Sequence, residues 1–309
     1  MFFTTTAKAQ KEAETFNVDS TLYEYYQRCQ EYLLEPVVLN MSDTLFRMAG
    51  ERQDERMQAV AIATQLDYYY FQGTNEDSVI HYTNKVKEFA KATHQPKYYY
   101  FAWANRLITY YLKTSRTNIA LYEVQNMLKE AQEEDDKTGL SRCYNIMSQI
   151  YTIKRFDSMA FEWRLKEIEL TEKYKIENYN ISQTYAQIAN YYINQKKQKE
   201  ALAAVEKAIA TANSSTQQIS AKLEFVNYYS KFGDFQAAEK LLKECQAAFE
   251  QDKRLESIKK RLYNIECLYY QQTKQYPKAL EAAKMQEKEE RRLSESILSS
   301  IHYRTQGEI

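Results

Sequence analysis

The sequence predicts an all-α protein built from successive helical hairpins. Gly and Pro are scarce, with 5 and 3 among 309 residues, whereas β-sandwiches and α/β folds need glycine-rich turns. Apolar residues make up 44% of the chain and it has 28 Tyr, which is too much apolar and aromatic matter for a disordered chain. A chain of 309 residues is long for one globule but normal for a repeat array.

A tyrosine recurs at near-constant spacing and marks a repeat. Tyrosine doublets or triplets occupy five of six positions, and Ile150-Tyr151 occupies the sixth. Successive positions lie 42, 40, 41, 37 and 41 residues apart. The anchor tyrosines that define this spacing are Tyr69, Tyr111, Tyr151, Tyr192, Tyr229 and Tyr270. Such self-similarity is the signature of repeated supersecondary units.

Each anchor is followed after nine residues by a small side chain, which lets a second helix approach the first closely. These residues are Ser78, Ala120, Ala160, Ala201, Ala238 and Ala279. Polar breakers lie between, and Gly73 and Gly233 stand four residues after an anchor, where a helix end favours glycine. Apolar residues within the half-repeats follow helical spacing, as in Tyr185, Ile188, Ala189 and Tyr192 and then Ala201, Val205 and Ala208. Each repeat is therefore predicted to be an αα-hairpin.

The junctions resemble those of tetratricopeptide repeat (TPR) proteins. The segments 229–238 and 270–279 reproduce the aromatic residue, the Gly-x-Tyr/Phe type of turn and the small residue of that family. The resemblance is strongest over residues 140–290, weaker over 60–140 and weakest before that. It implies a right-handed αα-solenoid of TPR-like hairpins that binds ligands on its concave face. The spacing exceeds the usual repeat of about 34 residues, and the closing proline of each repeat is missing.

The N-terminal region is predicted to hold two segments ahead of the solenoid. Residues 1–9 end in Ala7-Lys8-Ala9, the small-residue pattern of signal-peptide cleavage, so they are either a signal-peptide remnant or a chance match. Residues 10–50 fit a capping hairpin. Asp19 caps a first helix that includes Leu33, and Pro36 separates it from a second helix over 37–48. The TPR-like solenoid is expected over 51–290.

The C-terminal region is predicted to be one long helix that reaches about residue 304, because no Gly or Pro interrupts the chain between Pro277 and Gly307. Residues 291–309 form its end and carry an apolar stripe of Leu293, Ile297, Leu298 and Ile301. This stripe either covers the open end of the solenoid or forms a stalk that pairs with a second copy as a homodimer.

The sequence gives no sign of catalysis, a cofactor or a metal site. Lys and Arg balance Asp and Glu at 42 each, which argues against nucleic acid as a partner. The histidines are scattered, no hydrolase, nucleotide-binding or zinc motif occurs, and the acidic run 133–136 is interpreted as a solvated loop. The cysteines Cys29, Cys143, Cys245 and Cys267 form no CxxC, so buried free thiols are expected, with a Cys245–Cys267 disulfide as the alternative.

A ligand groove is predicted on the first helices of the hairpins, at positions six and two residues before the anchors and one turn further back. The candidates are Asn105, Arg142, Asn145, Gln149, Asn190, Asn227, Arg261 and Asn264. Asparagine offers a donor and an acceptor to an extended peptide, and arginine can hold a carboxylate. The alternative is that these residues are only solvated polar side chains.

The combination of a leader remnant, a tyrosine-rich repeat of about 40 residues and a long final helix is similar to the extracytoplasmic TPR regions of bacterial membrane-anchored two-component sensor histidine kinases. The segments 19–30, 43–51 and 95–101 add to this similarity. It implies a periplasmic or extracytoplasmic sensor region that binds a protein or peptide and is tethered to a membrane segment beyond its C-terminus. The alternatives are a free-standing cytoplasmic TPR adaptor that scaffolds other proteins, and an enzyme with an unrecognised site.

Overall fold

The computed structural model describes the backbone of residues 19–73, 75–176, 178 and 180–306, and side chains as far as residue 292. The chain divides into two compact units, Met1–Trp163 and Arg164–Ile309. Every regular element within the described residues is helical, which confirms the predicted all-α class. The predicted signal-peptide remnant (1–9) and the apolar stripe of the last helix fall outside the residues whose side chains are described.

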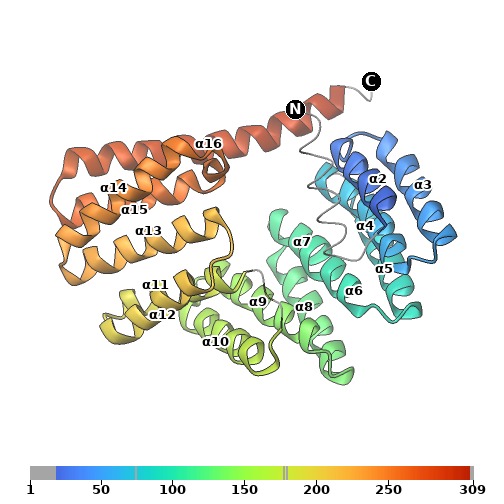
Figure 1. Cartoon of the computed structure of the whole chain (residues 1–309), viewed down its shortest axis with the longest axis horizontal. Coiled ribbons are helices and arrows are strands. Elements are labelled where there is room, and N and C mark those ends of the chain that lie inside the picture. The colour runs from blue at the N-terminus through green and yellow to red at the C-terminus, as the bar shows by residue number, and fades with distance from the viewer. Residues whose placement is uncertain (1–18, 74, 177, 179, 307–309) are drawn as a thin grey trace. The chain divides into compact units, whose positions relative to one another are not determined.

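Unit 1 consists of consecutive antiparallel hairpins (Figure 1). Its elements are α2 (Ser20–Glu31), α3 (Val37–Glu51), α4 (Glu55–Gln72), α5 (Glu76–Ala92), α6 (Pro96–Ala102), the π-helix η1 (Trp103–Ile108), α7 (Thr109–Lys113), α8 (Thr117–Glu133), α9 (Lys137–Ile153) and the start of α10 (Asp157–Tyr174). Asp19 caps α2 as predicted, accepting the Leu22 amide at 3.1 Å. The helix ends at Glu31, however, and leaves Leu33 in a turn.

Unit 2 continues the same pattern after the rest of α10. It contains α11 (Ile181–Asn194), α12 (Gln198–Ala210), α13 (Ser215–Phe232), α14 (Phe235–Gln251), the 3-10 helix η2 (Lys253–Ile258), α15 (Lys259–Gln272) and α16 (Tyr276–Gln306). The prediction of one long final helix is confirmed, because α16 runs without interruption through residue 306. No helix in the described part of the chain is both long and apolar enough to cross a membrane.

The junction of each hairpin shows why the tyrosine and the small residue recur together. Every anchor lies in the last two turns of a first helix, and the five alanines lie in the first turn of the second helix, where all are buried. Ser78 was the wrong choice for the remaining hairpin, because Val79 is the buried residue there. The loop before α5 is one residue longer than the loop before α14. The buried position follows the helix cap, Asn75 or Asp234, by four residues in both cases.

Most helices end in a left-handed residue that closes the last turn. Gly73 (φ 70°) and Gly233 (φ 90°) fill this role as predicted, and their amides donate to the carbonyls of Tyr69 and Tyr229. Elsewhere the same conformation is adopted by residues with a Cβ, at a cost that glycine would avoid. These residues are Gln53, His94, Ser115, Asp135, Arg155, Lys175, Lys196 and Lys274.

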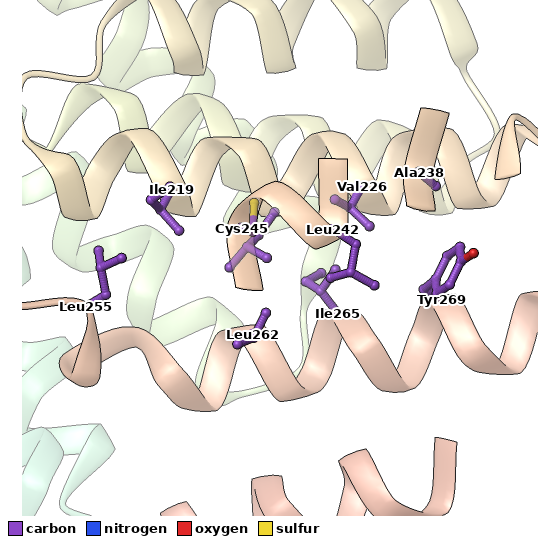
Figure 2. Close-up of a cluster of buried hydrophobic side chains, with 10 residues drawn as sticks. Ile219, Val226, Ala238, Leu242, Cys245, Leu255, Leu262, Ile265 and Tyr269 are labelled. Carbon is purple, nitrogen blue, oxygen red and sulfur yellow. The ribbon is translucent and has the colours of Figure 1, made fainter. Parts of the chain in front are cut away.

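The core of each unit is a layer of apolar side chains between helices. In unit 2, side chains from α13, α14, η2 and α15 meet in one cluster that includes Val226, Leu242, Leu255 and Ile265 (Figure 2). Buried Cys245 belongs to this cluster as a free thiol, and Cys267 is also a free thiol, so the alternative of a disulfide between them is not observed. A second cluster joins α2, α3 and α4 in unit 1.

Candidate functional site on the first helices

The first helices of successive hairpins lie side by side within each unit, and each second helix packs against the next first helix. In unit 1 the neighbours are α4, the continuous helix α6–η1–α7, and α9, and in unit 2 they are α11, α13 and α15. All eight residues predicted for the groove lie on these helices and outside the buried core.

Two of the predicted residues meet in unit 2 through a carboxylate that the sequence did not single out. Glu224 on α13 is only 3% exposed and accepts hydrogen bonds from Arg261 Nη2 and Asn227 Nδ2, both at 2.8 Å. A buried carboxylate is tolerated when partners compensate its lost hydration. Glu224 lies five residues before its anchor within an otherwise apolar stripe, and that break in the pattern was the available signal.

The remaining polar candidates face solvent in smaller groups. Gln149 donates to Asn145 Oδ1 at 2.7 Å on α9. Asn194 donates to Asn190 Oδ1 at 3.1 Å on α11, and Asn264 is exposed on α15. Neither of these two bonds holds a core group in place, so these side chains are accessible to a ligand within their own unit.

Unit 1 carries a different arrangement, which we call the cation–aromatic band. It consists of Tyr70, Phe71, Phe101, Arg106, Lys113 and Arg142. The Arg106 guanidinium lies 4.9 Å from the centre of the Phe101 ring and 5.0 Å from that of Tyr70. Lys113 Nζ lies 4.1 Å from the centre of the Tyr70 ring. Cations over aromatic faces are attracted by the ring quadrupole, most strongly where water is excluded.

One carboxylate pairs with the band. Asp67 on α4 binds Arg106 through both of its oxygens, with Nη2 to Oδ2 at 3.0 Å, and both side chains are 16% exposed. In this two-point geometry, both oxygens of the carboxylate accept hydrogen bonds from one guanidinium. Asp67 and Arg106 were both missed in the sequence. Asp67 lies two residues before its anchor, Tyr69, but was not included among the candidates, and Arg106 lies five residues before its anchor, outside the positions counted.

Arg142, a predicted groove residue, lies on α9 with its guanidinium 5.6 Å from the centre of the Phe101 ring. Its Nε is buried and has no hydrogen-bond partner. Burial lowers the pKa of Arg142, and the charge of Asp136 opposes this effect. Arg142 and Arg261 both precede their anchors by nine residues, yet only Arg261 is paired with a carboxylate among the described residues.

Asn105 is displaced from its predicted register by the π-helix η1. A π-turn inserts one residue into a helix, so positions before it shift by one relative to the anchor. Thr109 Oγ1 accordingly donates to the Ala104 carbonyl five residues earlier, at 2.9 Å. Ala104 is buried like Ala186 in unit 2, so Ala104 occupies the position that counting assigned to Asn105. Asn105 is half-buried, and its carbonyl accepts from Arg106 Nη1 at 3.1 Å.

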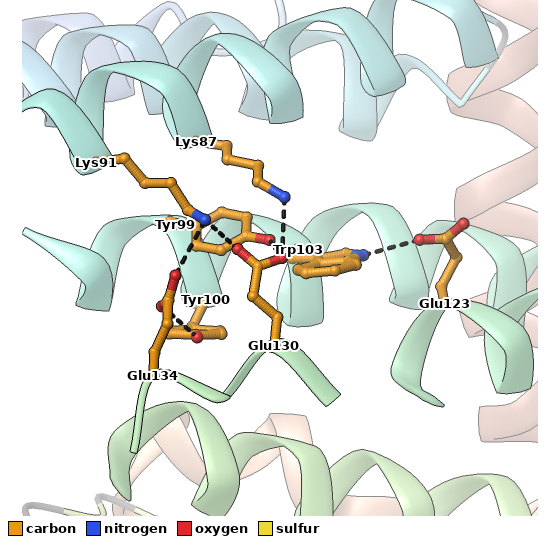
Figure 3. A network of polar contacts seen from close by, with 8 residues as sticks. All are labelled: Lys87, Lys91, Tyr99, Tyr100, Trp103, Glu123, Glu130 and Glu134. Atoms are coloured by element: carbon orange, nitrogen blue, oxygen red, sulfur yellow. Dashed lines mark hydrogen bonds and ion pairs between the residues drawn. The ribbon is translucent and has the colours of Figure 1, made fainter. Parts of the chain in front are cut away.

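A second polar cluster joins α5, α6, η1 and α8, and we call it the glutamate clamp. It contains Lys87, Lys91, Tyr99, Tyr100, Trp103, Glu123, Glu130 and Glu134 (Figure 3). Tyr99 donates to Glu130 and Tyr100 donates to Glu134, both at 2.9 Å, while Lys91 binds both carboxylates. The acidic run 133–136 lies at the turn between α8 and α9 with three of its four residues exposed, as predicted, but two of its side chains also make structural contacts. Glu134 binds a buried phenol, and Asp136 caps α9 by accepting the Gly139 amide.

The electrostatics of the glutamate clamp indicate a structural role. Burial raises the pKa values of Tyr99 and Tyr100, and their bonds to the two carboxylates raise them further, so both phenols stay protonated. Burial opposes ionisation of Glu130, but bonds from Lys91, Lys87 and Tyr99 outweigh it and lower the pKa. Lys87, Lys91, Glu130 and Glu134 form ion pairs with one another, and Glu123 accepts from Trp103 Nε1 at 2.9 Å, so the cluster ties together the helices that carry it. The described residues include no cluster of three or more His, Cys, Asp or Glu that could hold a metal ion.

No protein-family model matches this sequence, and no curated protein matches it. Solved structures do match. The apo form of RapI aligns with a TM-score of 0.59 and 14% identity, over 89% of this chain and 99% of RapI. A Rap protein complexed with competence and sporulation factor aligns with a TM-score of 0.58 and 13% identity, over 89% of this chain and 76% of the Rap chain.

A third similar structure is a signal transduction ATPase with numerous domains (STAND) and a tetratricopeptide repeat sensor, from Pyrococcus horikoshii. It aligns with a TM-score of 0.56 and 16% identity, over 91% of this chain and 43% of that protein. Identities this low show a shared fold alone. They confirm that the chain has a TPR-like helical-repeat fold, as the hairpin junctions predicted.

Proposed function

We propose that this chain is a non-catalytic module that binds a protein or peptide on its first helices, and that it serves as the sensor region of a two-component signalling protein. One observation supports binding above the others. The first helices present polar, cationic and aromatic side chains outside the core, whereas the apolar stripe of every hairpin is buried. Two of the similar structures, a Rap protein complexed with competence and sporulation factor and an ATPase with a tetratricopeptide repeat sensor, point in the same direction.

Extended peptides suit such a surface, because amide side chains along a helix can bond to a peptide backbone and arginines can hold its carboxylates. A sensor role further requires that ligand binding alters the packing between hairpins and that α16 transmits this change in packing to a partner domain. We place the protein outside the cytoplasm on the basis of the Ala-x-Ala pattern alone, and a cytoplasmic adaptor is the alternative.

Binding is tested by selecting random dodecapeptides on the immobilised full chain and titrating a recovered peptide by fluorescence anisotropy. The double variant Asn190→Ala/Asn264→Ala should bind at least about fivefold more weakly, since each lost hydrogen bond contributes on the order of 1 kcal/mol. Asn84→Ala, an exposed asparagine on the second helix α5, is the matched control and should bind normally. Equal affinity of all three proteins would remove the first helices of unit 2 as the binding surface.

The sensor role is tested by reading the gene on both sides of this sequence. A hydrophobic membrane segment and a kinase or regulator domain in the same frame after Ile309 would support it. A start codon at Met1 together with a stop codon directly after Ile309 would instead favour a free-standing adaptor.

A further inference from the structure

We propose that Arg142, together with Phe101 and Arg106, binds a carboxylate of the peptide or protein segment that docks on unit 1. The inference rests on the proposed binding function and names the ligand chemistry that this surface selects. The carboxylate belongs either to an Asp or Glu side chain or to a free C-terminus, because both present the same two oxygens.

The two units supply an internal comparison. In unit 2, the arginine nine residues before the anchor, Arg261, binds Glu224, which lies five residues before the preceding anchor. Direct counting from the anchor places Arg106 at the corresponding position in unit 1, and counting that allows for the residue inserted by η1 places Asn105 there, so neither count gives a carboxylate. Arg142 thus occupies the position of Arg261 on its helix, but no described residue of the neighbouring repeat forms an ion pair with it.

The charge of Asp136 acts on Arg142, but no acid within the described residues forms an ion pair with it. Asp67 is bound through both oxygens by Arg106, and an oxygen of Asp136 accepts the Gly139 amide at 2.6 Å. The cation–aromatic band therefore holds three cations, Arg106, Lys113 and Arg142, against the single carboxylate of Asp67. A guanidinium that is partly buried without a counter-charge is costly, and an arriving carboxylate removes that cost.

The geometry suits a carboxylate in particular. Two guanidinium groups lie near the Phe101 ring, with its centre 4.9 Å from that of Arg106 and 5.6 Å from that of Arg142. The buried Nε of Arg142 leaves its terminal nitrogens as the available donors, and a guanidinium edge matches two carboxylate oxygens. The adjacent Asp67 and the zero net charge of the chain disfavour nucleic acid, whose binding needs an extended basic surface.

The first experiment measures ligand preference on the full chain. Dodecapeptides selected on the wild-type protein should be enriched in Asp and Glu. One selected peptide is then synthesised with Glu or with Gln at its enriched position, each as the free acid and as the C-terminal amide. Arg142→Gln and the Glu-to-Gln change in the peptide should each weaken binding about tenfold or more, and together no further than either alone. An effect of amidation instead of the side-chain change assigns the carboxylate to the C-terminus.

Arg116→Gln is the matched control, because Arg116 lies at a hairpin loop of the same unit and is already paired with Glu76 at 2.6 Å. It should bind normally. Binders without any carboxylate preference, or unchanged affinity of Arg142→Gln, would overturn this inference while leaving the proposed function intact. A wild-type chain that selects no peptide would overturn both.

The second experiment needs no ligand and compares thermal unfolding of two variants. Arg261→Gln should lower the Tm by several degrees, because it leaves the buried Glu224 with a weaker partner. Arg142→Gln should leave the Tm within about 2 °C of the wild type, because it removes a cation that forms no ion pair. An equal loss in both variants would show that Arg142 is neutralised inside the fold and would refute its role as a receptor.

Discussion

Replacing Gly139 with alanine should destabilise unit 1, against the usual trend for glycine inside a helix. Gly139 is the third residue of α9, and a Cβ built there would lie 2.8 Å from Cζ and 2.9 Å from Cε2 of Tyr100. Real Cβ atoms essentially never approach another heavy atom closer than 3.0 Å. Tyr100 is fully buried and its hydroxyl binds Glu134 at 2.9 Å, so the ring cannot yield without breaking the glutamate clamp.

The opposing effects have different sizes. Alanine gains up to about 1 kcal/mol over glycine in helix propensity. Overpacking a buried site costs about 1–3 kcal/mol, and loss of the hydrogen bond to a charged carboxylate costs about 1.5–3 kcal/mol. We therefore expect a net loss of about 2 kcal/mol. For a unit of this size, that corresponds to a fall of about 4–8 °C in the unfolding temperature, measured by circular dichroism.

Gly50→Ala is the matched control within the same unit. Its Cβ would meet Gln58 Nε2 at 2.9 Å, which is the end of a flexible side chain that can move aside. We expect its stability to stay within about 0.5 kcal/mol of the wild type or to rise. A Gly139→Ala protein at least as stable as the wild type would refute the packing argument. In a Tyr100→Leu background, the added alanine should cost less, because the ring that it strikes is gone.

Three further predictions concern stability and reactivity. Because the folded-state pKa of Glu130 is lowered, the ionised carboxylate stabilises the fold above its unfolded-state pKa, and this stabilisation is lost as the pH falls through the folded-state pKa. The Tm of Glu130→Gln should therefore fall less between pH 7 and pH 3 than the Tm of the wild type. Equal falls in the two proteins would contradict this. Lys274→Gly should stabilise unit 2 by about 1 kcal/mol in urea unfolding because it relieves a φ of 59°, whereas Lys288→Gly within α16 should destabilise it similarly. Iodoacetamide at pH 8 should label Cys267 alone, as mass spectrometry would show, because the other three thiols are buried with raised pKa values; labelling of a second cysteine in the native chain would contradict the burial.

The difference between the two predicted arginines shows the limit of counting along the sequence. Arg142 and Arg261 occupy the same position relative to their anchors, and the sequence assigned both the same role. Their states differ because the preceding repeat supplies the partner: Arg261 binds the buried carboxylate of Glu224, whereas Arg142 lies near the Phe101 ring. The sequence thus located the candidate surface, but the charge that each residue meets depends on a helix some 40 residues away.

Local periodicity was sufficient for the hairpins. A tyrosine near the end of one helix and an alanine in the first turn of the next reflect steric needs that recur in every repeat, so they are visible in a single chain. The same holds for the left-handed glycines Gly73 and Gly233 and for the uninterrupted α16, whose causes lie within a few residues of one another.

Tertiary structure decided the features whose causes lie far apart in the chain. The inserted residue of η1, which displaced Asn105, cannot be recognised in the sequence, because the hydrogen bonds of a π-helix differ from those of an α-helix only in spanning one more residue. In the sequence Gly139 is only a residue that weakens a helix, and the structure shows that the Tyr100 ring of the neighbouring hairpin leaves no room for a Cβ there. Local backbone conformation depends on adjacent residues and can be predicted from them, whereas packing and charge pairing between repeats depend on which surfaces the folded chain brings together.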